Sequence, residues 1–154
     1  MSEFYEKMMA LAEAEKNMPA KRYLNDVEHQ TQVNCVTWFR LQYPKYEKLL
    51  FAVPNGGGRS KRTAGKLKAE GVVRGVSDLL MLVPAGKYHG LCIEMKKEEV
   101  TYNERGRKTV KRGYQEPEQK EWQALVEKQG YKYVVCWNSE GFQKEVNEYL
   151  KEKK

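Results

Sequence analysis

The sequence predicts an α/β fold in which a mixed β-sheet is flanked by helices. Short apolar segments of strand length alternate with longer segments that have helical spacing and capping residues. With 154 residues, 40% of them hydrophobic, the chain is long enough to bury one substantial core. We therefore expect a single domain over residues 1–154, with the element order helix, helix, strand, helix, strand, strand, helix, strand, helix.

Capping residues and prolines define the first two helices. Ser2 is a suitable N-cap for a helix over residues 3–17, an N-terminal extension that ends before Pro19. A second helix is expected to begin at position 25 or 26, where Asn and Asp are favourable caps. It should end at about Gln42, because Pro44 follows closely.

Loops that contain proline and glycine separate the next elements. Residues 48–53 predict a short buried strand, and the Pro-Asn-Gly-Gly-Gly run that follows predicts a loop. Residues 61–70 predict a short basic helix that Gly71 closes as a C-cap. Two apolar strands are then expected over residues 75–83 and 90–96, joined by a turn.

The last third of the chain begins with a polar, highly charged segment, residues 97–114. It lacks helical periodicity, so we expect an exposed loop or a protruding hairpin there. Pro117 is well placed to begin a helix that continues to position 129 and stops at Gly130. A strand over residues 131–137 and a terminal helix capped by Ser139 complete the domain.

The composition bounds the class of protein. There are 28 Lys and Arg against 21 Asp and Glu, a net charge of +7, and clustered cations attract phosphates. A basic surface without a polyanionic partner is the alternative that charge leaves open. Cys35, Cys92 and Cys136 lie far apart in apolar stretches, so we expect buried free thiols rather than a zinc site. No segment has the length of a signal-peptide core or a membrane span, so a cytoplasmic location is expected.

Asp78, Glu94 and Lys96 are the candidate catalytic residues. Side chains alternate across a strand, so Glu94 and Lys96 should point to one face, and a hairpin can place Asp78 beside them. Two carboxylates and a backbone carbonyl form a hard oxygen site suited to Mg²⁺ or Mn²⁺. The alternative is a turn aspartate and an ordinary same-face ion pair. Charges at the end of an otherwise apolar strand are costly without a task, which favours the catalytic interpretation.

These residues resemble a known nuclease family. The pattern Asp-x15-Glu-x-Lys is similar to the catalytic core of the restriction-endonuclease-like, or PD-(D/E)XK, nucleases. The ordered set over about residues 26 to 137 resembles the virus-type replication-repair nucleases, the VRR-Nuc family. Ser77 stands where the superfamily pattern has proline. The segments that carry the resemblance are Glu28-His29-Gln30, Pro54-Asn55-Gly56-Gly57, Gly71-Val72-Val73-Arg74-Gly75-Val76-Ser77-Asp78, Glu94-Met95-Lys96 and Gln119-Lys120-Glu121-Trp122.

The resemblance implies a restriction-endonuclease-like fold and metal-dependent cleavage of phosphodiester bonds. It implies that Gln119 is an active-site residue bonded to the catalytic lysine or the phosphate, while Trp122 packs the helix on the sheet. Without the resemblance, Glu28 would be an ordinary first-turn glutamate and Gln119 a solvated helix residue. The implied catalytic residues are Asp78, Glu94, Lys96 and Gln119, and the implied metal ligands are Glu28, Asp78, Glu94 and the carbonyl of Met95.

Basic residues precede the catalytic strand. Glycines there allow backbone amides to approach phosphates, so we expect DNA contacts, and a flexible solvated turn is the alternative. The polar segment 97–114 is also basic, and either an arm that contacts DNA or a disordered charged loop fits it. The candidate DNA-binding residues before the catalytic strand are Asn55, Arg59, Lys61, Arg62, Lys66 and Arg74.

The sequence predicts a Mg²⁺-dependent endonuclease that acts on DNA structure more than base sequence, since no base-reading module is visible. One active site per short chain favours a homodimer. The resemblance to standalone VRR-Nuc proteins implies resolution of Holliday junctions, a phage source and location in the host cytoplasm. A flap or nicking nuclease with the same fold is the nearer alternative. A noncatalytic DNA-binding module is a further alternative, which the intact catalytic residues disfavour.

Overall fold

The computed structural model describes residues 27–54 and 61–152. The helix expected over residues 3–17 lies outside this part, as do Asn55 and Arg59. A four-stranded sheet has the order β1 (Leu50–Ala52), β2 (Leu79–Met81), β3 (Leu91–Met95), β6 (Lys132–Cys136). The first three strands pair antiparallel, whereas β3 and β6 are parallel. The predicted mixed α/β fold is confirmed.

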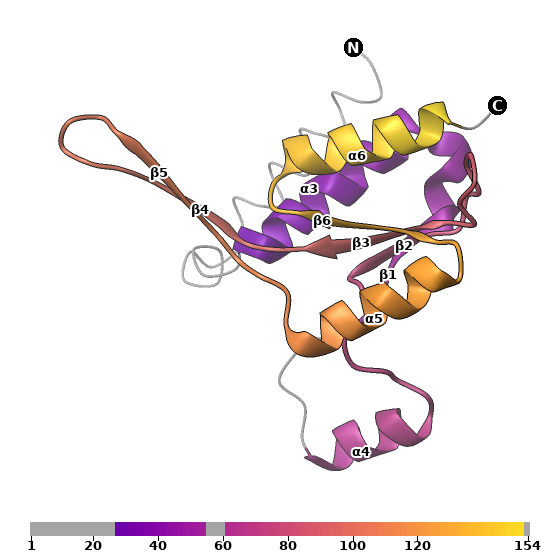
Figure 1. Cartoon of the computed structure of the whole chain (residues 1–154). Helices are drawn as coiled ribbons and strands as arrows, with labels where there is room; N and C mark the ends of the chain where they lie inside the picture. The colour runs from indigo at the N-terminus through magenta and orange to yellow at the C-terminus, as the bar shows by residue number, and fades with distance from the viewer. Residues whose placement is uncertain (1–26, 55–60, 153–154) are drawn as a thin grey trace, which may run out of the picture.

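Helices cover both faces of the sheet (Figure 1). The helices α3 (Val27–Gln42) and α6 (Ser139–Lys151) lie on one face, where Phe39, Phe142 and Tyr149 are fully buried. The helix α5 (Pro117–Lys128) lies on the other face, over a smaller cluster that contains Cys92. Alternation along β3 therefore sends odd-numbered side chains to the larger core and even-numbered ones toward α5.

The segment before the sheet differs from the prediction. Residues 44–49 form a 3-10 helix, η1 (Pro44–Leu49), and the strand begins only at Leu50. A proline at the first helical position favours a helical turn because its φ is already fixed near the helical value. The strand was also predicted to be buried, but Phe51 is 40% exposed, because β1 is the edge strand of the sheet.

The basic helix α4 (Lys61–Ala69) ends as the sequence predicts. Gly71 has a φ of +100°, which glycine adopts without steric cost. The N–H of Val72 donates to the carbonyl of Leu67 at 2.9 Å, and that of Gly71 donates to Lys68 at 3.1 Å, the two bonds of a Schellman motif. Figure 1 shows α4 standing apart from the sheet, below α5.

The charged segment 97–114 forms a hairpin of β4 (Glu98–Tyr102) and β5 (Lys108–Arg112), which extends away from the rest of the domain (Figure 1). Its tip is an ordered turn, in which Oδ1 of Asn103 accepts hydrogen bonds from the amides of Arg105 and Arg107. Of the two forms that the sequence allowed, the structure has the protruding hairpin.

The N-cap of the terminal helix α6 lies one residue earlier than predicted. The N-cap is Asn138, whose Oδ1 accepts a hydrogen bond from the amide of Gly141 at 2.8 Å, so Ser139 lies inside the helix. The three cysteines are free and buried, as predicted. Within the described residues, no helix is both long and apolar enough to cross a bilayer.

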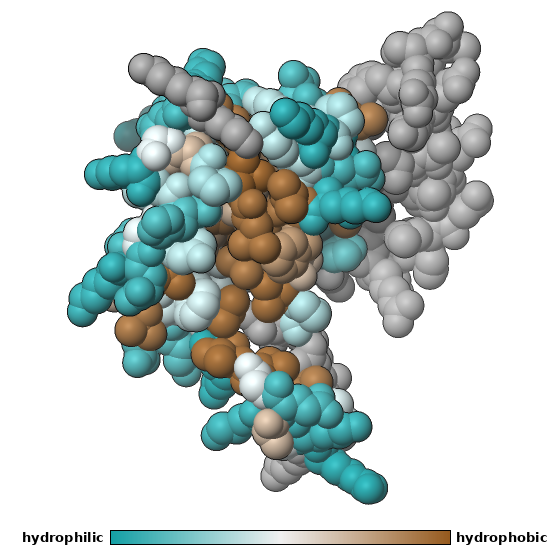
Figure 2. All heavy atoms as spheres, turned by 90° about the vertical axis from the view of Figure 1, so that its right-hand side faces the viewer, coloured by the Kyte–Doolittle hydropathy of each residue, from teal (hydrophilic) through white to brown (hydrophobic). Residues whose placement is uncertain are grey.

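Apolar residues also reach the surface. Figure 2 shows the face that lies to the right in Figure 1, where hydrophobic residues gather in a central strip bordered by hydrophilic ones. Phe51 on the edge strand is 40% exposed, Leu49 at the end of η1 is 39% exposed, and Leu82 just after β2 is 50% exposed. These side chains are exposed because no described helix covers this part of the β1–β2 edge.

Candidate active site

The pairing of β2 with β3 brings Asp78 to the end of the strand that carries Glu94. Leu79 lies opposite Ile93, so the same register places Asp78 beside Glu94. The carboxylate of Asp78 accepts a hydrogen bond from the amide of Met95 at 2.8 Å. Its backbone carbonyl accepts from the amide of Val53 at 2.8 Å. Asp78 is therefore held between the edge strand and β3, as the hairpin argument predicted.

Glu94 is a charged side chain that the fold buries almost completely, with 1% of its surface exposed. The ammonium group of Lys96 lies 3.0 Å from Oε1 of Glu94, and the hydroxyl of Tyr133 donates to Oε2 at 3.4 Å. Lys96 itself keeps 14% of its side chain exposed. Glu94 and Lys96 therefore share one face of β3, and the ammonium group is partly open to solvent.

Gln119 completes the set of groups around Glu94. It is the third residue of α5, and its Oε1 accepts the amide of Glu116 at 2.8 Å in a capping box. Because the oxygen is used by the cap, the amide nitrogen is turned toward the sheet, where it donates to Oε1 of Glu94. The resemblance implied a bond to the lysine or the phosphate, so the partner of Gln119 differs from that expectation.

Burial and mutual repulsion govern the charge state of the two carboxyl groups. Burial, together with the negative charge of Asp78, raises the pKa of Glu94 to about 7, although Lys96 opposes the shift. Burial also raises the pKa of Asp78 above its ordinary range, against the hydrogen bond from Met95 and the charge of Lys96. Because the two carboxylates repel each other when both are ionised, a cation bound between them would stabilise the ionised pair.

The donor set fits a hard divalent cation. Paired carboxylate oxygens are the ligands that Mg²⁺ and Mn²⁺ prefer, and such an ion would offset the repulsion between Asp78 and Glu94. Across residues 27–54 and 61–152, no group of three or more His, Cys, Asp or Glu side chains gathers closely enough to hold one ion. The structure therefore brings together Asp78 and Glu94. Glu28 and the carbonyl of Met95 stay predicted ligands.

Sequence reasoning missed Tyr133 and Gln115. Tyr133 lies opposite Cys92 in the parallel pairing of β3 with β6, which places its hydroxyl near Glu94. Gln115 donates to that hydroxyl at 3.4 Å and to Gln123 at 3.0 Å. The alternation of residues 131–137 could show that Tyr133 faces one side of a strand. It could not show the register against β3, which a long intervening segment separates in sequence.

The candidate DNA-binding residues that the structure describes lie on α4 and in the loop that follows it. Arg62 and Lys66 are exposed on α4, and Lys66 forms an ion pair with Glu70 at 3.7 Å. Arg74 is also exposed and lies 3.6 Å from Glu118 at the start of α5. Lys61 is the first residue of α4. Arg62, Lys66 and Arg74 give α4 and the following loop a basic exposed surface, and its contact with DNA stays a prediction.

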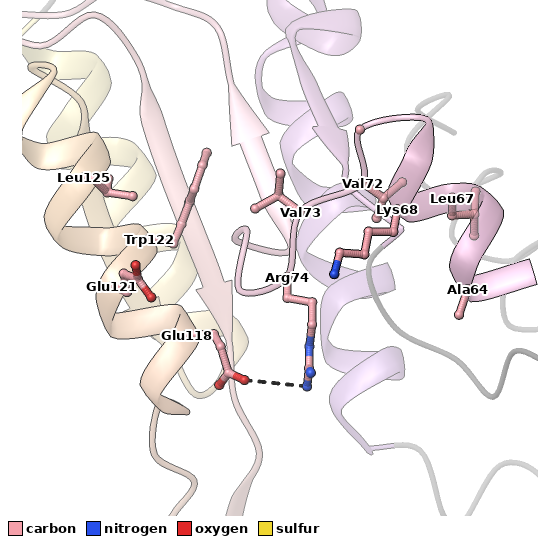
Figure 3. Close-up of a pocket in the computed structure, with 11 residues that line it drawn as sticks. Ala64, Leu67, Lys68, Val72, Val73, Arg74, Glu118, Glu121, Trp122 and Leu125 are labelled. Atoms are coloured by element: carbon pink, nitrogen blue, oxygen red, sulfur yellow. Dashed lines mark ion pairs between the residues drawn. The ribbon is translucent and has the colours of Figure 1, made fainter. Parts of the chain in front are cut away.

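A pocket of about 880 Å³ lies between α4 and α5 (Figure 3). In Figure 3, Val73 and Trp122 point toward one another across it, and Lys68 and Arg74 approach from the α4 side. Neither Asp78 nor Glu94 lines this pocket, although α5 and the loop before β2 contribute to both the pocket and the candidate site. Its lining consists of Ala64, Leu67, Lys68, Gly71, Val72, Val73, Arg74, Glu118, Glu121, Trp122 and Leu125.

The raised pKa of Glu94 predicts how the metal-free protein responds to pH. Between its ordinary pKa of 4.5 and its folded pKa of about 7, the folded state holds a proton that the unfolded state releases. The free energy of unfolding should therefore fall as pH rises through this range, and this group should contribute a fall of about 2 kcal/mol between pH 5.5 and pH 8. Urea unfolding in chelator at pH 5.5 and 8 measures the change. Glu94→Gln should reduce that change, and an equal pH dependence in the variant would contradict the assignment.

Comparison with known proteins identifies a similar fold. No family model and no curated protein matches the sequence. Among solved structures, the chain is similar to a VRR_NUC domain protein, with 27% sequence identity and a TM-score of 0.64. The likeness covers 82% of this chain and 89% of that one, so it extends over nearly the whole of both folds.

Proposed function

The chain belongs to the VRR-Nuc family of nuclease domains, with a restriction-endonuclease-like fold, and from this premise we propose that it is a Mg²⁺-dependent DNA endonuclease. One observation carries the proposal: the carboxylate of Glu94, only 1% exposed, is held beside Asp78 and 3.0 Å from the ammonium group of Lys96. A structural ion pair would need neither the second carboxylate nor burial of this kind.

Each residue of the site would have a distinct role. Asp78 and Glu94 would hold the ion, with Glu28 and the carbonyl of Met95 as further predicted ligands. When bound, a divalent cation supplies Lewis-acid polarisation of the phosphate and acidifies water. The partly exposed ammonium group of Lys96 can donate a hydrogen bond toward a phosphate oxygen, where negative charge increases during cleavage.

Two further side chains position Glu94. Gln119 donates to Oε1 and Tyr133 to Oε2, so both carboxylate oxygens have partners before any ion arrives. The capping box holds the amide of Gln119 in one orientation, which couples the start of α5 to the site. Gln119 and Tyr133 therefore act as positioning residues, because their contacts in the structure are to the carboxylate.

The proposed substrate is branched DNA, with the four-way junction first, and the proposed active form is a homodimer. A symmetric pair of sites suits symmetric cuts in a four-way junction. The exposed apolar side chains at the β1–β2 edge favour burial against a second copy. A monomer by analytical ultracentrifugation at micromolar concentration, with and without junction DNA, would contradict the dimer.

A panel of labelled substrates tests the activity. Four-way junctions, flaps, nicked duplexes and plain duplexes of matched length are incubated with Mg²⁺ or with chelator. We expect cleavage only with Mg²⁺, fastest on the junction, with paired symmetric cuts. Preferential cutting of flaps or single nicks would favour the alternative nuclease of the same fold. Binding without cleavage in Mg²⁺ or Mn²⁺ would identify a noncatalytic DNA-binding module.

A further inference from the structure

The β4–β5 hairpin is firmly attached at its base. It begins two residues after Lys96, and its base packs against the junction of β6 and α6. The indole N–H of Trp137 donates to the carbonyl of Gly113 at 2.8 Å, and the side-chain amide of Asn138 donates to Glu98 at 3.0 Å. The guanidinium of Arg112 lies 5.2 Å from the Trp137 ring centre and bonds Glu98 at 2.7 Å. These contacts fix the base of a hairpin that would be only marginally stable alone.

The outer part of the hairpin carries unpaired positive charge. At the base, Arg112 forms an ion pair with Glu98, and Lys97 forms one with Glu99. Each cation holds the pKa of its carboxyl partner below the usual range. Toward the tip, Glu104 is the only acidic residue near Arg105, Arg107 and Lys108, whereas Lys111 lies opposite Glu99 across the two strands. Within the described part of the chain, four exposed cations of the hairpin make no ion pair: Arg105, Arg107, Lys108 and Lys111.

The hairpin also has an exposed apolar face. Val100 and Val110 lie directly opposite each other, exposed by 41% and 42%, and Tyr102 beside them is 67% exposed. A second copy of the chain is one partner that could pack on this face. The four cations, however, lie on both sides of the valine pair, so two arms packed face to face would bring like charges together. Charge complementarity therefore favours a polyanion as the occupant.

We propose that the β4–β5 arm lies along duplex DNA beside the cleavage site and binds its phosphates through Arg105, Arg107, Lys108 and Lys111. The proposal rests on the proposed function, because DNA must occupy the carboxylate site for the arm to meet it. A two-stranded ribbon fits the major groove of B-DNA. Its five-residue strands are about 16 Å long, which corresponds to about five base pairs.

Binding without cleavage separates the arm from catalysis. The Kd for a labelled four-way junction and for a 30-base-pair duplex is measured in chelator across a range of salt concentrations. The variant replaces all four arm cations by glutamine. We expect its Kd to rise at least tenfold at about 0.1 M salt. The slope of log Kd against log salt should fall by about 3 to 4, because each phosphate contact contributes about 0.9.

A control variant removes the same charge elsewhere. Lys87, Lys128, Lys144 and Lys151 are exposed and lie outside the arm, and their replacement by glutamine should change the slope by less than about 1. Equal losses in the two variants would overturn the proposal, because general charge rather than the arm would then be responsible. Thermal melting confirms that both variants are folded, which is expected since all eight positions are exposed.

Two further outcomes separate the possible failures. An arm variant that loses a dimer in ultracentrifugation, with an unchanged salt slope, would show that a second copy occupies the arm and would overturn the proposal. If the protein cleaves nothing but the arm variant still loses binding, the proposed function fails while the arm inference holds.

Discussion

Replacing Asp78 by asparagine is expected to lower the rate of DNA cleavage in Mg²⁺ by about a thousandfold, equivalent to about 4 kcal/mol of transition-state stabilisation. The change removes one of two carboxylates that would hold the ion. It keeps an oxygen that can accept the hydrogen bond from the amide of Met95, so the strand end should stay in place. Single-turnover cleavage of a labelled four-way junction at saturating enzyme measures the effect.

The result has controls that separate metal binding from folding. Glu148 is exposed on α6, and Glu148→Gln changes the net charge equally, so its cleavage rate should stay within about twofold of wild type. Mg²⁺ should raise the melting temperature of wild type but not of the Asp78→Asn variant, because ligand binding stabilises only a folded site that retains affinity. Wild-type cleavage by Asp78→Asn would remove Asp78 from the catalytic site.

Replacing Gly75 by alanine is expected to destabilise the protein by about 3 kcal/mol, or about 6–12 °C in melting temperature. Gly75 has a φ of +80°, which costs an L-residue about 1–2 kcal/mol. A Cβ at this position would also lie 2.4 Å from the carbonyl oxygen of Glu118 and 3.0 Å from the amide of Gln119. The loop before β2 or the first turn of α5 must therefore move.

A matched glycine isolates the steric part of this effect. Gly106 at the hairpin tip has a φ of +72°, but a Cβ there would meet nothing within 4 Å. Gly106→Ala should therefore cost only the conformational term, about 1–2 kcal/mol. The Gly75 variant should also lose cleavage activity at temperatures where it is still folded, because displacing α5 moves Gln119 from Glu94. Equal stability losses in the two variants would contradict the close contact.

Local features of the fold could be read from the sequence because they depend on neighbouring residues. Pro117 and Gly130 bound α5 as predicted, and the Schellman motif at Gly71 ends α4. The limits of β1 were predicted less well. An apolar run shows that a segment can be buried, but whether a neighbour covers it depends on the whole sheet, and β1 is an edge strand.

The sequence by itself determined that Glu94 and Lys96 share a face and that Asp78 can meet them, because alternation and hairpin pairing act over short distances along the chain. Only the tertiary structure decided that Tyr133 and Gln119 bind Glu94. Both arrive through the connection from β3 to β6, which contains the arm and α5. The register of β6 against β3 cannot be predicted from residue spacing across such a crossover. This register is set by how α5 packs on the sheet rather than by neighbouring residues.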